Sequence, residues 1–263
     1  MIITKSELKI KLINLGLTSG QVVIVHSSLS EFGYVLGGAQ TIINVLLDIL
    51  GKKGTLVMPA FSPQISDPST WSNVKFDEID LKMARKSIPV FDKDTTPTTM
   101  GHISEVFRNW AGTVRSSHPQ VSVCANGLLA KKITSLHKLE WGEGKGSPFE
   151  RLVEMNAVVL LLGVGFNRIT LLHYAESLVV NGRRKIRKIP MVENEHLIWK
   201  EFMDVGDDLD THFPIIGKEF IKSGNVSQLK IGKAFCSLMN SRDLIDFSVI
   251  YFENIFSNHK TSL

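Results

Sequence analysis

The chain has 263 residues, of which 43% are hydrophobic and 21% are charged, and its formal net charge is +4 at pH 7. This composition is ordinary for a soluble globular protein. The N-terminus lacks the apolar core of a signal peptide and no apolar run is long enough to span a bilayer, so we expect a cytoplasmic protein without a membrane partner. Two cysteines are too few for a disulfide framework. The mild positive charge suits an anionic ligand but is too weak to indicate nucleic-acid binding.

The N-terminal part of the chain predicts a βαβ unit. Leucines at helical spacing in 4–15, followed by Gly16, indicate an amphipathic helix. A short β-branched strand is expected at 22–25, a helix with one apolar face at 39–50, and a second buried strand at 55–58. A strand, a glycine-bearing loop, a helix and a strand in this order are typical of two parallel strands joined by a crossover helix.

Residues 61–99 differ from the preceding segments in composition and in periodicity. They are rich in proline, aspartate and serine, and they show no long periodic segment. Irregular chain of this length inside a compact domain is usually functional, as a lid or a binding loop. We therefore expect an irregular segment on the substrate side at about 61–99.

The second half of the chain continues the alternation of strands and helices. The apolar run 157–162 predicts a buried strand ended by Gly163 and Gly165, and Thr170 is the expected N-cap of a helix at 171–179. Further helices are expected at 103–110, 128–136, 148–155, 214–222 and 242–256, and extended segments at 121–124, 185–189 and 197–205. The predicted fold class is α/β, a single compact domain over 1–263 with a mixed central sheet flanked by helices.

The first strand-to-helix connection carries residues that suit an anion. Ser27 and Ser28 follow the strand, and Gly37 and Gly38 precede the helix. Unpaired N–H groups and the positive end of a helix dipole can hold a pyrophosphate. A plain connecting loop with a capped helix fits the same pattern about equally well.

Three other polar clusters have two interpretations each. Segment 115–119, followed by Ser122, combines a cation, hydroxyls and an imidazole, and segment 142–148 is a glycine-rich approach to a helix. Each indicates either contacts to a phosphate or a structural turn. The basic run 183–188 is more often a solvated strand or loop than a phosphate site, and its role stays open.

His173 and Glu176 lie three residues apart on the predicted helix 171–179. This spacing projects both side chains from one face, where they can meet each other or converge on a ligand. A base beside a carboxylate at the end of a strand suits catalysis, whereas a half-buried histidine with a solvated glutamate is the simpler structural alternative.

Taken together, these segments resemble the aminoglycoside 3-N-acetyltransferase family. The likeness is strong over residues 20–180, and the order and spacing of its segments make it specific. The segments that carry it are Val25-His-Ser-Ser-Leu29 with Gly37-Gly38, Gly54-Thr-Leu-Val-Met-Pro59, Phe91-Asp92 with Thr96-Pro97 and Met100-Gly101, Arg115-Ser-Ser-His-Pro119, Gly146-Ser-Pro148, Leu160-Leu-Leu-Gly-Val164 and His173-Tyr-Ala-Glu176.

The resemblance implies acetyl-CoA-dependent transfer of an acetyl group to an amine, without a metal, on a fold distinct from the GNAT acyltransferases. It implies His173 as the general base, with Glu176 orienting it or holding the substrate's ammonium, and Asp92 on the substrate side. The residues implied for the coenzyme site are Ser27, Ser28, Leu29, Val35, Gly37, Gly38, Ser116, His118 and Ser122. We expect direct transfer without an acyl-enzyme, with backbone N–H groups near Ser28 and Leu29 stabilising the oxyanion. The chain lacks the motifs of serine hydrolases, zinc proteases and P-loop proteins.

The acceptor amine stays open at this stage. An aminoglycoside is a polycation and needs several carboxylates, and acidic residues gather in the irregular segment, namely Asp67, Asp77, Glu78, Asp80, Asp92 and Asp94. A basic protein would more naturally take an amino sugar linked to a nucleotide diphosphate. A non-catalytic coenzyme A-binding homologue is the alternative outside the enzymes, and a homodimer is possible.

Overall fold

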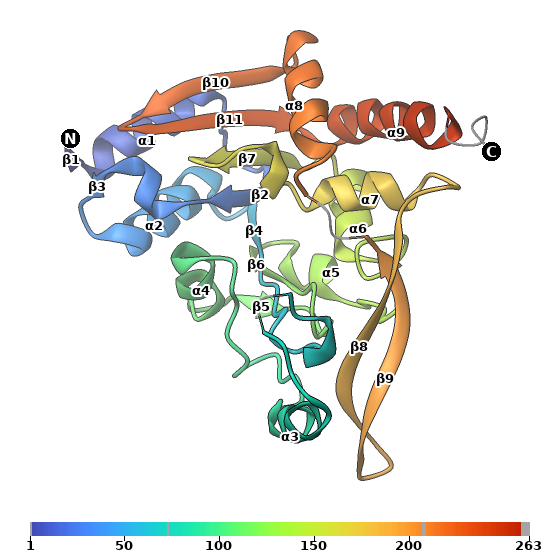
Figure 1. Cartoon of the computed structure of the whole chain (residues 1–263). Coiled ribbons are helices and arrows are strands. Elements are labelled where there is room, and N and C mark those ends of the chain that lie inside the picture. The colour runs from blue at the N-terminus through green and yellow to red at the C-terminus, as the bar shows by residue number, and fades with distance from the viewer. Residues whose placement is uncertain (1, 73, 207–208, 259–263) are drawn as a thin grey trace.

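The computed structural model describes residues 2–72, 74–206 and 209–258. Its centre is a seven-stranded mixed sheet (Figure 1). From edge to edge the strands are β10 (Val226–Ile231), β11 (Ala234–Asn240), β7 (Val158–Leu162), β2 (Val22–Ser27), β4 (Thr55–Pro59), β6 (Val123–Gly127) and β5 (Val114–Arg115). β2 runs parallel to both of its neighbours, β7 and β4, whereas β6 and β11 run antiparallel to theirs.

The three parallel strands bury both faces, because their sequences are nearly continuous aliphatic runs. α2 (Gly38–Leu50) connects β2 to β4, which confirms the predicted βαβ unit. Ser27, the last residue of β2, is registered against Leu162, the last residue of β7. The loops that follow these two strands therefore begin side by side at one edge of the sheet.

Side chains alternate along β2 between two hydrophobic cores, one on each face of the sheet. Val23 and Val25 belong to the core formed with α1 (Lys5–Leu15), α2 and α4 (His102–Arg108). Ile24 belongs to the opposite core. The helices of that core are α5 (Ala130–Thr134), α6 (Pro148–Glu154), α7 (Leu171–Ser177), α8 (Phe213–Lys222) and α9 (Ser241–Asn258). No helix within the described ranges, α9 included, is long and apolar enough to cross a bilayer.

Two smaller sheets flank the central one. β8 (Arg184–Glu193) and β9 (His196–Val205) form an antiparallel hairpin that projects away from the central sheet (Figure 1). β1 (Ile2–Ile3) and β3 (Tyr34–Val35) pair in parallel beside the start of α2. The hairpin confirms the predicted extended segments, although both strands are longer than the sequence indicates.

Two expectations from the sequence are wrong, and two strands were missed. The segment 61–99 is not irregular throughout, because it contains α3 (Glu78–Ser87), which begins at the cap Asp77. Thr170 does not cap α7: it has helical backbone angles, and its side chain makes no capping hydrogen bond. The strands β10 and β11 were not expected at all, yet β11 pairs with the central strand β7.

Candidate functional site

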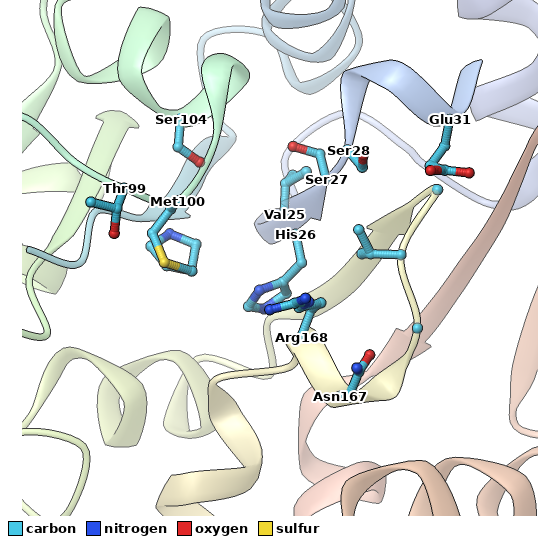
Figure 2. A pocket seen from close by; sticks show the side chains of 14 residues that line it. Val25, His26, Ser27, Ser28, Glu31, Thr99, Met100, Ser104, Asn167 and Arg168 are labelled. Carbon is cyan, nitrogen blue, oxygen red and sulfur yellow. The ribbon is translucent and has the colours of Figure 1, made fainter. Parts of the chain in front are cut away.

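A cavity of about 480 Å³ opens at the edge of the sheet where β2, β4 and β7 end (Figure 2). Four chain segments build the described part of its wall: the end of β2 with the turn that follows, the end of β4, the residues around 99–104, and the loop after β7. The described lining residues are Val25, His26, Ser27, Ser28, Glu31, Pro59, Thr99, Met100, Ser104, Gly163, Val164, Gly165, Asn167 and Arg168. The carboxyl ends of the strands are where open parallel sheets bind ligands.

Two of the predicted coenzyme residues, Ser27 and Ser28, line this cavity. The backbone N–H of Ser28 donates to the carbonyl of Leu162 at 2.9 Å, so it is already bonded within the sheet. This bond contradicts the expectation that the Ser28 N–H stabilises an oxyanion. Leu29 begins the short 3₁₀ helix η1 (Leu29–Phe32) and packs against the core, so its side chain serves the fold.

The other predicted residues of this connection, Val35, Gly37 and Gly38, lead into α2. Val35 is buried in β3, while Gly37 and Gly38 have φ angles of 79° and 56°. A Cβ atom on Gly37 would lie 2.3 Å from Oγ1 of Thr41, so the turn requires glycine there. The structure therefore explains these glycines by the entry into α2, and their contact with a coenzyme stays a prediction.

Gly163 shapes the cavity wall beyond the end of β7. Its φ angle is +71°, and a Cβ atom there would lie 2.7 Å from Cβ of Glu31. Because a side chain fits neither the backbone conformation nor the space, the loop after β7 can approach η1 only with glycine at this position.

His26 and Arg168 line the cavity but were not predicted as site residues. The His26 ring is 4% exposed, and burial lowers its pKa to about 3. Arg168 is an exposed cation at the end of η3 (Phe166–Arg168). His26 directly precedes the predicted residues Ser27 and Ser28 in the Val25–Leu29 segment, and this position was the available signal.

His173 lies on α7, only a few residues beyond the cavity-lining Asn167 and Arg168. Its side chain is 2% exposed, and its ring centroid lies 4.9 Å from that of Phe213. His173 is not among the described residues that line the cavity. His173 thus follows the cavity-lining residues closely in the sequence, but its side chain is buried in the core.

Glu176 is fully buried and is bound by Arg183. Its carboxylate accepts hydrogen bonds from Nε of Arg183 at 2.6 Å, from Nη2 at 2.9 Å and from the backbone N–H at 3.0 Å. The charge of the carboxylate is thus already matched within the protein. The solvated glutamate of the structural alternative is wrong, and the contacts seen here support an anchoring role for Glu176 between α7 and the hairpin.

Ser116, His118 and Ser122, predicted to contact the coenzyme, are at most 1% exposed and lie outside the described cavity lining. Nδ1 of His118 accepts the backbone N–H groups of Gln120 and Val121, so its Nε2–H donates to the carbonyl of Leu139. Burial lowers the pKa of His118 well below its usual value. These side chains close a structural turn, the alternative that the sequence had left open.

The hydroxyl of Ser116 takes part in a similar buried chain. It accepts from the backbone N–H of Val123 at 2.9 Å and bonds Nδ1 of His137 at 2.8 Å. Nε2 of His137 donates to the carbonyl of Gly142 at 2.7 Å, which connects this turn to the glycine-rich segment 142–148. Burial lowers the pKa of His137 to about 4, so the ring is neutral at neutral pH.

Arg115 holds the segment 61–99 onto the sheet. Its guanidinium donates to the carbonyls of Ala60 and Thr96 and to the hydroxyls of Ser62 and Ser122. It also lies over the ring of Phe91, 4.9 Å from the centroid. The buried guanidinium of Arg115 thus binds both ends of the segment, Ala60 and Ser62 at its start and Thr96 at its end.

The acidic residues of this segment are largely engaged within the protein. Asp92, predicted on the substrate side, accepts the backbone N–H groups of Asp94 and Thr95 and the hydroxyl of Thr95, which lowers its pKa. Asp67 is buried and bonds Arg85 at 2.7 Å, and Asp77 caps α3. These contacts explain three of the acids structurally.

Most of the basic run 183–188 lies on β8, and its Arg187 meets buried acids whereas its Lys188 meets an exposed one. Arg187 bonds Asp204 at 2.8 Å and lies 3.7 Å from Glu143, and Lys188 bonds Glu201 at 2.9 Å. The solvated strand favoured from the sequence is therefore wrong for Arg183 and Arg187. A second hollow of about 280 Å³ lies beside this strand; Trp71, Gln120, Lys185 and Lys188 are among its lining residues.

The sequence is similar to known proteins over nearly its whole length. A family model described as aminoglycoside 3-N-acetyltransferase matches residues 24–253. The SPbeta prophage-derived aminoglycoside N(3')-acetyltransferase-like protein YokD of Bacillus subtilis is 36% identical over 253 residues, which cover 95% of this chain and 93% of the relative. Aminoglycoside N(3)-acetyltransferase IX of Micromonospora chalcea is 30% identical over 272 residues, covering 95% and 94% of the two chains.

Solved structures show the same likeness in three dimensions. The crystal structure of YokD from Bacillus subtilis matches with a TM-score of 0.93 at 35% identity and covers 100% of this chain and 97% of its own. AAC-IIIb, solved as a binary complex with CoASH, matches with a TM-score of 0.86 at 30% identity and covers 97% of this chain and 98% of its own.

Proposed function

Since the chain belongs to the aminoglycoside 3-N-acetyltransferase family and is therefore an acetyltransferase, we propose that it moves the acetyl group of acetyl-CoA to an amine of an aminoglycoside or a related amino sugar. The observation that carries the proposal is the cavity at the carboxyl ends of β2, β4 and β7. It gathers the hydroxyls of Ser27 and Ser28 and the side-chain-free Gly163 at one wall. Its volume of about 480 Å³ suits a part of a small-molecule ligand.

The residues of this wall fit a coenzyme's arm. Short hydroxyl side chains and glycines let an extended ligand approach the backbone closely, and Arg168 in the described lining is an exposed cation, which suits a phosphate. The likeness to AAC-IIIb, solved with CoASH, supports the same assignment. Acetyl-CoA supplies the activated acetyl group, and the protein contributes binding, orientation and proton transfer.

The transfer is direct in this proposal. The amine nitrogen attacks the thioester carbonyl carbon, the C–N bond forms as the C–S bond breaks, and the proton lost by nitrogen ends on the coenzyme's thiolate. Cys124 and Cys236 are buried, and burial raises their pKa values to about 12 and about 11. Because a thiolate is the nucleophilic form, their raised pKa values argue against a cysteine acyl-enzyme.

We assign the general base to His173, which must accept the proton as the amine attacks. α7 begins at Leu171, shortly after the cavity-lining Asn167 and Arg168, and we infer that a shift of this loop gives the substrates access to the ring. In the structure the ring packs against Phe213, and its role as base therefore depends on such a movement when the substrates bind. Glu176 then acts by fixing α7 through Arg183 rather than by contact with the amine.

His173→Ala tests the base. Turnover with acetyl-CoA and an accepted amine should fall by at least about a hundredfold, the usual scale of general base catalysis, while coenzyme A affinity stays largely unchanged. His196→Ala, on the exposed turn of β9, is the matched control and should retain wild-type turnover. Wild-type turnover in His173→Ala would remove this residue from the mechanism.

The acceptor is tested by thiol release from acetyl-CoA with gentamicin-class drugs beside a panel of nucleotide-linked amino sugars. An anionic acceptor is favoured by one observation, the hollow lined by Trp71 and Lys185 beside the basic strand β8. Turnover only with the nucleotide-linked sugars would exclude aminoglycosides as substrates. Coenzyme A binding without turnover on any amine of either panel would instead support a non-catalytic coenzyme-binding protein.

A further inference from the structure

His26 is the one histidine among the described residues that line the cavity. Figure 2 shows its ring extending from β2, and His26 and Arg168 both line the cavity. The ring is 4% exposed, and its Nε2 atom is buried without a hydrogen-bond partner. A polar atom buried in this way destabilises a protein, because it loses its bonds to water and gains none in return.

The position itself would accept an aliphatic residue. Val22 and Ile24, four and two residues earlier on β2, belong to the core on one face of the sheet, and His26 continues the same alternation. Its register partner on β7, Leu161, belongs to that core as well. The fold alone thus gives no reason for an imidazole here, whereas a ligand in the cavity does.

The charge state of the ring selects the ligand chemistry. Burial lowers the pKa of His26 to about 3, so at neutral pH the ring is uncharged and offers one N–H donor and one acceptor nitrogen. The same depressed basicity makes it a poor proton acceptor, unlike the base that the transfer needs. An uncharged ring does not attract an ammonium substrate, but it suits the uncharged amides of a pantetheine chain.

We propose that His26 contacts the coenzyme and hydrogen-bonds an amide of the pantetheine arm of acetyl-CoA. This inference rests on the proposed function and adds to it the residue that holds the arm beside Ser27 and Ser28. In this proposal the ring turns about its Cβ–Cγ bond to bring Nε2, which is buried in the structure, to the coenzyme.

The test uses the full chain with His26→Leu and His26→Gln, the second of which keeps an N–H donor. The probes are coenzyme A and adenosine 3′,5′-bisphosphate, which is the nucleotide end of the coenzyme without the arm. His26→Leu should weaken coenzyme A binding about tenfold, the scale of one lost hydrogen bond, and leave the bisphosphate affinity unchanged. His26→Gln should restore most of the coenzyme A affinity.

Ligand-free stability separates this role from a structural one. The unfolding temperature of His26→Leu without ligand should rise, because the variant replaces an unpartnered polar group by an apolar one. A lowered unfolding temperature together with wild-type coenzyme A affinity would overturn the inference, and so would an equal loss of both probes. If the wild-type protein neither binds coenzyme A nor releases thiol, the proposed function itself fails. Wild-type turnover with unchanged coenzyme A binding in His26→Leu would overturn the inference about His26 and leave the proposed function intact.

Discussion

The guanidinium of Arg183 covers the carboxylate of Glu176, with side-chain exposures of 24% and 0% and a separation of 2.6 Å between Nε and Oε1. The two residues join the end of α7 to the start of the β8–β9 hairpin, which otherwise projects away from the sheet. Because only one member of the pair reaches water, removing the two partners should have unequal effects.

Arg183→Ala should lower the free energy of unfolding by about 3–5 kcal/mol, because it leaves a buried carboxylate without its cation. Glu176→Gln should cost less, about 1–3 kcal/mol, because the remaining guanidinium can turn to solvent. Urea unfolding at pH 7 measures both, with Lys222→Ala of an exposed pair as the control. A larger loss in Glu176→Gln than in Arg183→Ala would show that the carboxylate has another role in stability.

Arg115 is the main tie between the segment 61–99 and the sheet, through the carbonyls of Ala60 and Thr96 and the hydroxyl of Ser62. Arg115→Ala should cost about 3 kcal/mol or more, since several buried acceptors lose a charged donor at once. The segment should also become a site of rapid limited proteolysis. Arg184→Ala, an exposed arginine on β8, is the control, and cleavage at the wild-type rate in Arg115→Ala would contradict the tie.

Local patterns were sufficient for the part of the fold that builds the cavity. The aliphatic runs of β2, β4 and β7 and the periodic face of α2 are strong signals, and the structure confirms all four elements. By contrast, half of the residues of β10 are exposed and α3 buries none of its own, so neither contributes a continuous run of buried side chains. Elements that depend on one edge contact or a tether are therefore harder to predict from sequence.

Only part of the candidate site could be predicted from the sequence. Ser27 and Ser28 follow a strong strand, and their place at the cavity follows from parallel topology. The partner of Glu176 could not be predicted, because Arg183 reaches it only through the turn after α7. Nor does sequence distinguish a buried, bonded side chain such as His118 from one that faces a ligand.

Gly163 should be the least replaceable residue of the cavity wall. Gly163→Ala places a Cβ 2.7 Å from Cβ of Glu31 and forces a side chain into a φ of +71°. We expect a loss of about 1–3 kcal/mol in stability and a raised KM for acetyl-CoA, because the wall must shift. Gly165→Ala is the control on the same loop, since its φ is −90°. Equal effects of the two substitutions would mean that the close approach to η1 is not needed.

Acid should destabilise this protein at a higher pH than carboxylate protonation alone would. Burial lowers the pKa of His26 to about 3 and that of His137 to about 4, while in the unfolded chain both have values near 6.5. The unfolded state therefore binds more protons as the pH falls below about 6.5, and stability decreases until the folded-state pKa is reached. Above pH 6.5 these two groups should add no pH dependence.

Each of these histidines can lower the free energy of unfolding by up to about 1.4 kcal/mol for every pH unit between the unfolded and folded pKa values. Urea unfolding between pH 7.5 and pH 5, about one unit above the ordinary carboxylate range, measures the slope. His26→Gln should make the slope shallower by the share of one histidine, because glutamine does not titrate. An identical slope in His26→Gln and the wild-type protein would mean that His26 has the same pKa in the folded and unfolded states, which would contradict the lowered pKa of the buried ring.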